Sequence, residues 1–306
     1  LHAKKGEFEA MEHASTAERR LMLPLFEIAP FTDKVHALVR YRDLAEPIAA
    51  YLRTTAAEIV DAYPQQPVMV DTARWTETEM TETGELAITY AIQALRDRGQ
   101  PVVPVVGLVR WESEEYQLAL KALPFKGEPT WVLRLDTADM EDAADPEHFL
   151  ERVEDVMQGL GVLPKNMGIL MDFEDVSGHL VDTLEALADR VLRLLGPGGY
   201  QFYSLVGCSM PPSVDKAVKK HNTEGTVSRK EMLAWRRRLR FEGRRCHWWH
   251  GCRRCRRRHL VGVEAVRRHP GMRGHGLRVL VRRAEVHRLR LQRSRRQLRV
   301  EPVGGV

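Results

Sequence analysis

Acidic side chains recur where short apolar runs of this sequence end. They are Glu27 in LPLFEI, Asp71 in PVMVDTARW, Asp136 in WVLRLD and Asp172 in MGILMDFED. If these runs are parallel strands, their carboxyl ends share one edge. Carboxylates gathered there can bind a hard cation such as Mg²⁺ or divide acid and base roles between them. We therefore take the four residues as candidate catalytic groups. The alternative is that each one caps a helix or pairs with a neighbouring arginine.

Basic side chains follow the same pattern of run ends. They are Lys4, Arg74, Arg110 and Arg134. A guanidinium presents its donors in a planar fork that matches the oxygens of a phosphate or a carboxylate. We take these four residues as candidate substrate-binding groups for a phosphorylated or carboxylated small molecule.

Other chemistries have weaker sequence signals. Residues 1–240 contain no H-E-x-x-H, G-x-S-x-G, G-x-G-x-x-G or P-loop pattern, which disfavours zinc proteases, α/β-hydrolases and the common nucleotide-binding sites. Cys208 in LVGCSMPP has no base evident in the sequence, and we expect it to be a small buried thiol and not a nucleophile.

The elements that carry these residues alternate between apolar runs and amphipathic stretches, as parallel strands covered by helices do. The expected strands are 23–28, 67–71, 101–109 (beginning late because of Pro104), 131–136, 167–173 and 202–210. The expected helices are 43–62, 84–98, 113–123, 145–161 and 177–195, and a further one whose capping box is Ser228 with Glu231.

Counting a first strand at LHAK with its helix KKGEFEAMEHA gives seven strand-helix units, and an eighth strand would fall near Leu239. The pattern predicts an α/β fold, a TIM-like (β/α)₈ barrel that is incomplete at the eighth unit. An open doubly wound sheet has the same local pattern and is the alternative.

Charge divides the chain at about residue 240. The whole sequence has 47 Lys and Arg against 42 Asp and Glu, but residues 241–306 hold 19 arginines, four glutamates, no lysine and no aspartate. Removing that segment leaves 28 basic and 38 acidic residues in 1–240, an acidic domain for which nucleic-acid binding is not expected. Alanine, glycine and aspartate codons of a GC-rich gene become arginine codons when read out of phase. We therefore interpret 241–306 as out-of-frame or disordered sequence, and a genuine basic tail is the alternative.

The stretch HWWHGCRRCRRRHL in this tail raises the question of a zinc site. Cys252 and Cys255 form a C-x-x-C pair with His259 close behind. Structural zinc modules usually bring two ligand pairs from separate positions, whereas all the ligands here fall in one arginine-rich run. Zinc at Cys252 and Cys255 is therefore disfavoured.

The motifs LHAKKGEFEAM, LPLFEIAPF, VMVDTARW, VVPVVGLVR and MGILMDFEDV occur in this order, and together they resemble the beta protein family of bacteriophages and bacteria. The resemblance covers about residues 1–239. The family usually continues after EMLAWRRRLRF with a Gly-Asp-Tyr type motif, where this chain reads FEGRRCHWW. This departure puts the eighth barrel unit in doubt.

The resemblance implies an association with phage and prophage loci and with host defence, but no defined reaction. It leads us to expect an interaction protein that senses or restrains a protein partner encoded at a neighbouring phage-related locus. A barrel enzyme is the alternative. No run reaches the roughly 20 apolar residues that cross a bilayer, and no signal peptide is evident. We therefore expect a cytoplasmic protein without membrane contact, missing a few residues before Leu1.

Overall fold

The structure is a computed structural model that describes residues 5–125, 130–209, 224–242, 278–280 and 288–292. The α-helices described are α1 (Lys5–Glu12), α2 (Thr16–Arg19), α3 (Asp33–His36), α4 (Pro47–Ala62), α5 (Ala87–Arg96), α6 (Leu108–Trp111), α7 (Glu114–Lys121), α8 (Thr137–Asp142), α9 (Pro146–Leu160), α10 (Val181–Leu195) and α12 (Lys230–Glu242). Two short 3₁₀ turns are η1 (Pro164–Asn166) and η2 (Gly196–Gly198). The strands described are β1 (Leu25–Glu27), β2 (Val68–Asp71), β3 (Val102–Gly107), β4 (Trp131–Leu135), β5 (Met167–Asp175), β6 (Phe202–Cys208), β7 (Glu224–Ser228), β8 (Arg278–Leu280) and β9 (Arg288–Gln292).

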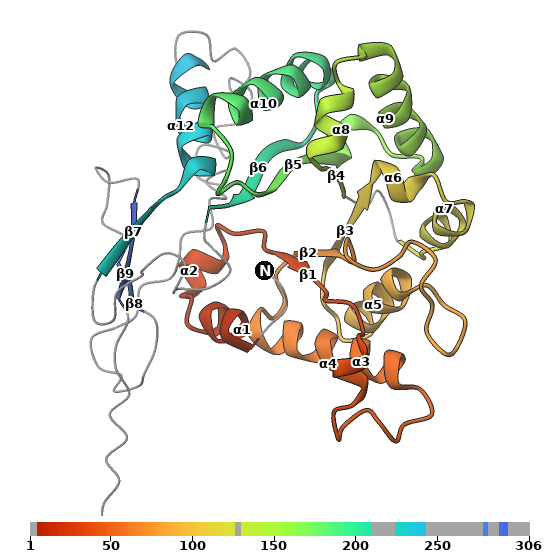
Figure 1. Ribbon diagram of the computed structural model, residues 1–306. Helices are drawn as coiled ribbons and strands as arrows, with labels where there is room; N and C mark the ends of the chain where they lie inside the picture. The colour runs from red at the N-terminus through yellow and green to blue at the C-terminus, as the bar shows by residue number, and fades with distance from the viewer. Residues whose placement is uncertain (1–4, 126–129, 210–223, 243–277, 281–287, 293–306) are drawn as a thin grey trace, which may run out of the picture. The chain divides into compact units, whose positions relative to one another are not determined.

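The strands β1 to β6 form one parallel sheet in which each strand lies beside the next one along the chain. The sheet curls as half of a barrel, and the helices α4, α5, α7 and α9 lie outside its curve (Figure 1). A doubly wound sheet requires the strand order to reverse at a switch point. The sequential order observed here therefore disfavours that alternative. The fold is α/β with a half-barrel sheet.

The inner face of this sheet is built by the two-residue alternation of its strands. An apolar cluster on that face contains Met69, Val103, Val105, Val132 and Leu170, and Leu25, Phe202 and Val206 pack against it. The residues two positions further along β1, β2, β4 and β5 are charged: Glu27, Asp71, Arg134 and Asp172. Side chains two residues apart on a strand share a face, so the charged residues form a layer next to the apolar cluster, toward the carboxyl ends of the strands.

Helix ends agree with the sequence signals at α9 and α7. The Asp145 side chain accepts a hydrogen bond from the backbone N–H of His148, and Gly161 ends α9 in the left-handed conformation. Ser113 caps α7 by accepting from the backbone N–H of Tyr116. These caps satisfy N–H groups that have no partner within their helix.

Three sequence-based expectations about these elements are corrected. β3 begins at Val102 and includes Pro104, although its pairing with β4 starts only at Val105. The proline therefore lies outside the β3–β4 ladder, where a missing N–H is tolerated. The residue expected in an eighth strand, Leu239, lies in α12.

The third correction concerns the start of α12. Ser228 ends β7 and is exposed, and the N-terminus of α12 is capped by a residue distant in sequence. The hydroxyl of Ser209 accepts a hydrogen bond of 2.8 Å from the Lys230 N–H and donates one to the Glu231 carboxylate. A capping signal read from neighbouring residues cannot detect a cap supplied by tertiary structure.

The chain divides into two compact units. The described residues up to Phe173, together with Ala186–Val206, form the first unit. The second contains Glu174–Glu185, α12 and an antiparallel sheet in which β7 and β8 each pair with β9. Thus β8 and β9, which belong to the arginine-rich segment, form part of a sheet.

The expected first strand at LHAK and the remainder of 243–306 lie outside the described residues. Within the described part of the chain, no helix has the length and apolar character needed to cross a membrane.

Candidate functional site

Arg134 is the centre of the charged layer on the inner face of the sheet. Its Nη1 donates to Asp71 Oδ2 at 2.8 Å, and its Nη2 donates to Glu27 Oε2 at 3.0 Å and to Asp172 Oδ2 at 2.6 Å. One guanidinium on β4 therefore binds carboxylates from β1, β2 and β5. The fixed fork of donors in arginine makes this three-way contact possible.

Two further arginines complete what we call the ionic layer. Arg110 on α6 places Nη1 2.7 Å from Asp71 Oδ1, and Arg74 places Nε 2.7 Å from Glu27 Oε1. The layer thus contains three carboxylates (Glu27, Asp71 and Asp172) and three guanidiniums (Arg74, Arg110 and Arg134), whose formal charges cancel. Burying several like charges together is costly unless opposite charges compensate them, and here the arginines provide that compensation.

Most of the ionic layer is shielded from solvent. Asp71 is fully buried and the Arg134 side chain is only 11% exposed, whereas the Arg74 side chain is 60% exposed. Burial alone lowers the pKa of the Arg134 guanidinium, but Asp71, Asp172 and Glu27 outweigh it and raise that pKa above its ordinary value. Burial likewise opposes charging of Arg110, and Asp71 holds the Arg110 pKa above its usual range. Both guanidiniums therefore stay charged, and Arg74 is the most exposed guanidinium of the ionic layer.

A glycine makes room for Arg110 in this layer. Gly107 at the end of β3 is in register with Arg134. A Cβ built on Gly107 would lie 3.3 Å from both Nε and Nη2 of Arg110, tighter than most such contacts. The missing side chain thus lets the Arg110 guanidinium fold back over the strand end toward Asp71.

The structure brings together six of the eight predicted site residues. Asp136 does not join them, because β4 ends at Leu135 and Asp136 becomes the N-cap of α8. Its carboxylate accepts a hydrogen bond of 2.9 Å from the Asp139 N–H, which is the helix-capping alternative expected for such residues. Lys4 lies outside the described residues. Cys208, expected to be buried, is exposed at the end of β6.

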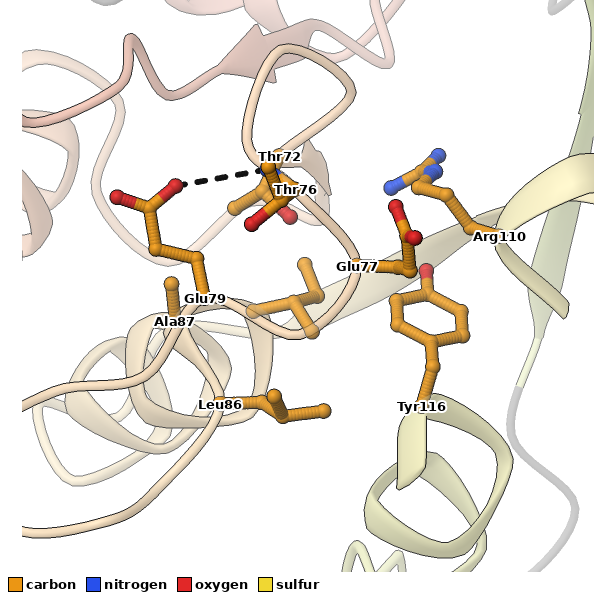
Figure 2. Close-up of a pocket in the computed structure, with 9 residues that line it drawn as sticks. Thr72, Thr76, Glu77, Glu79, Leu86, Ala87, Arg110 and Tyr116 are labelled. Atoms are coloured by element: carbon orange, nitrogen blue, oxygen red, sulfur yellow. Dashed lines mark hydrogen bonds between the residues drawn. The ribbon is translucent and has the colours of Figure 1, made fainter. Parts of the chain in front are cut away.

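Sequence reasoning missed the side chains next to Arg110. A narrow hollow beside it is lined by Thr72, Thr76, Glu77, Glu79 and Tyr116, as well as by aliphatic side chains at the start of α5 (Figure 2). Tyr116 lies on α7, and the Arg110 Cζ is 5.6 Å from the centre of its ring. No motif marks these residues. The only signal available from sequence was that 72–86 and 108–116 both follow strand ends.

Metal binding was one expected use of the strand-end carboxylates. Among the described residues, no group of three His, Cys, Asp or Glu side chains is placed to hold a metal ion. The cation between Glu27, Asp71 and Asp172 is the guanidinium of Arg134. Cys252 and Cys255 lie outside the described residues.

Comparison with known proteins gives one match. The model of the family described as Beta protein matches residues 1–249. No curated protein matches this chain. No solved structure matches it either.

Proposed function

Since the chain belongs to the Beta protein family, for which the comparisons bring no defined reaction, we propose from the site itself that it is an enzyme acting on a phosphorylated or carboxylated small molecule. One observation carries this proposal: carboxylates from three strands and arginines from three segments meet at the carboxyl ends of a curved parallel sheet. Enzymes of the barrel class place their catalytic groups at that end of the strands.

The contacts suggest different roles for the carboxylates. Asp71 is buried between Arg110 and Arg134, so it serves to position the two guanidiniums. Glu27 shares one oxygen with Arg134 and faces the exposed Arg74 with the other. A ligand anion bound by Arg74 would therefore lie next to this second oxygen. We therefore assign Glu27 as the group that exchanges a proton with the ligand, with Asp172 beside it, and Arg74 and Arg110 as the anion-binding groups.

The test is a screen of the full chain against phosphorylated and carboxylated small molecules, with and without Mg²⁺, that follows both thermal shift and turnover. Glu27→Gln keeps the shape and the acceptor oxygen that faces Arg134, and should lower turnover by about 10²- to 10⁴-fold, the usual contribution of acid–base catalysis. Glu112→Gln, in the exposed ion pair with Arg152, is the control and should act as wild type. Binding and turnover of no compound, or equal rates for the two variants, would reject the enzyme.

A second function is favoured by a different surface of the same unit. Residues 37–46, between α3 and α4, expose Leu38, Val39 and Leu44, and Val39 is 77% exposed. The base of this loop is held by Phe31, whose ring packs against Tyr41 and Tyr51. Apolar side chains presented on a braced loop are typical of protein contact sites. Together with the phage and prophage association implied by the resemblance, they support a cytoplasmic protein that restrains a partner from a neighbouring locus.

Co-expression with the neighbouring genes of its locus tests this second function. If the loop binds the partner, Val39→Asp should abolish any effect of the chain on the partner's toxicity or on phage plating. Leu118→Asp places the same charge at a similarly exposed position on α7 and should leave the effect intact. An absence of any effect of the wild-type chain would exclude this function without bearing on the enzyme screen.

A further inference from the structure

The hollow beside Arg110 contains a buried hydroxyl without a partner. The Tyr116 side chain is almost fully buried, and its hydroxyl has no hydrogen-bond partner among the described residues. Buried polar groups in native proteins are nearly always hydrogen-bonded, so an exception needs a functional or structural explanation. Figure 2 shows this hydroxyl pointing into the hollow, on the side of Arg110.

Tyr116 is suited to donate a hydrogen bond there. Burial raises its pKa to about 12, with the Arg110 charge acting against this shift and the Asp71 charge adding to it. The hydroxyl therefore keeps its proton at neutral pH. The guanidinium of Arg110, which stays charged, lies on the same side of the ring. A neutral donor and a cation that face one space are a typical arrangement for binding an anion.

One acidic side chain of the chain itself already points into this space. Glu77 is exposed and lies in the loop 72–86, between β2 and α5. In Figure 2 its carboxylate is directed toward the gap between the Arg110 guanidinium and the Tyr116 hydroxyl. Glu79 of the same loop also lines the hollow, but its carboxylate points away from Arg110 and accepts a hydrogen bond from the Thr76 N–H at 3.4 Å.

We infer that Arg110 and Tyr116 form a subsite for the carboxylate of a small ligand, and that the Glu77 carboxylate competes with the ligand for it. This inference rests on the proposed enzyme and names the anionic group that its substrate carries. The hollow is too narrow for a water-sized sphere. Binding of a ligand therefore requires the loop 72–86, which carries Glu77, to move outward.

Charge and shape favour a carboxylate over a phosphate. Arg110 is shared with Asp71, 2.7 Å away, so the subsite has less than one full positive charge to offer a new anion. A single negative charge suits it better than a phosphate dianion. The opposite side of the hollow is aliphatic, formed by Leu86, Ala87 and Ile88, so a ligand that enters would place a short carbon chain against it. Propionate is therefore the simplest probe.

The experiment titrates propionate into the full chain and into three variants, with inorganic phosphate as the second ligand. Glu77→Gln removes the internal competitor and should tighten propionate binding by about 3-fold or more. Tyr116→Phe removes one hydrogen bond and should weaken it by about 3- to 10-fold. Glu85→Gln makes the same charge change on the same loop, at an exposed residue that does not line the hollow, and should bind propionate as wild type does.

Several outcomes would overturn the inference. They are equal affinity in the Glu77 and Glu85 variants, unchanged affinity after Tyr116→Phe, tighter binding of phosphate than of propionate, and no propionate binding by any variant. The melting temperature shows whether Tyr116→Phe is folded, and because that change removes an unpartnered buried hydroxyl, it should not fall. Turnover that depends on Glu27 would uphold the proposed enzyme even if the subsite failed.

Discussion

At the scale of single residues, the position of Arg134 explains why the carboxylates of the inner face can be buried together. Its three hydrogen bonds reach Glu27, Asp71 and Asp172 on three other strands. The sequence predicted that these carboxylates lie at strand ends, because each one closes an apolar run. It could not predict that Arg134 would bind them and not a substrate, because that choice depends on register between strands far apart in the chain.

Replacing Arg134 tests this central role. Arg134→Lys keeps the charge but loses the fork, so at least one buried carboxylate loses a charged hydrogen bond. We expect the free energy of unfolding to fall by about 1.5–3 kcal/mol or more, as measured by denaturant titration. Arg74→Lys is the control, because its exposed ion pair should contribute less than about 1 kcal/mol. Equal losses in the two variants would contradict a central role for Arg134.

Asp139 gives a prediction about pH. Burial and the Asp136 charge together raise its pKa to about 6, with the Asp136 N–H and the Arg152 charge acting in the opposite direction. The folded protein thus binds this proton more tightly than the unfolded chain, in which the pKa is near 3.8. The resulting stability is fully present below about pH 4 and is lost as the pH rises through about 6, by at most about 3 kcal/mol.

Asp139→Asn should remove that pH dependence. The amide keeps an oxygen to accept the Asp136 N–H, and it no longer has to ionise in a buried site. Relative to wild type, the variant should gain stability between pH 4 and pH 7 in chemical unfolding experiments. Asp142→Asn, at the exposed carboxylate that contacts the same Arg152, should show no such gain. Parallel stability curves for wild type and Asp139→Asn would show that this assignment is wrong.

At the scale of elements, local signals predicted well wherever the structure also uses local contacts. Asp145 with Pro146 marked the start of α9, and the apolar runs marked the strands β1 to β6, because these features need only neighbouring residues. The predictions failed where distant residues decide. The start of α12 is one case, since its cap, Ser209, comes from the segment after β6.

The cap of α12 can be tested by two matched serine variants. Ser209→Ala removes the acceptor for the Lys230 N–H and leaves the Glu231 carboxylate without its buried donor. We expect a loss of about 1–2 kcal/mol and faster amide exchange in the first turn of α12. Ser228→Ala changes the residue that the sequence pattern favoured, which is exposed, and should have little effect. A larger loss of stability for Ser228→Ala than for Ser209→Ala would instead support the local capping box of Ser228 with Glu231.

At the scale of the whole molecule, the order of the strands disfavours the doubly wound sheet, one of the two predicted folds. Six parallel strands in chain order agree with a barrel type of sheet, and the inner face then collects residues from every strand. The alternation of side chains along each strand shows which residues share a face, but it shows which residues meet on the inner face only when the strand order is known. For the same reason, the sequence predicted that strand-end residues cluster but not which of them, and Asp136 lies outside the ionic layer as the N-cap of α8.

The origin of residues 241–306 is the remaining prediction at this scale. A segment with 19 arginines and no lysine or aspartate differs sharply from the acidic residues 1–240, and its charges repel one another. We expect sequencing of the gene to show a base inserted or deleted near codons 236–243. Expression in the restored frame should give a more soluble protein with a higher melting temperature, because a completed barrel has no exposed strand edges. An intact frame through Val306 would contradict this interpretation. So would tight binding of one zinc ion by Cys246, Cys252, Cys255 and His259, because either result would make the segment a genuine basic module.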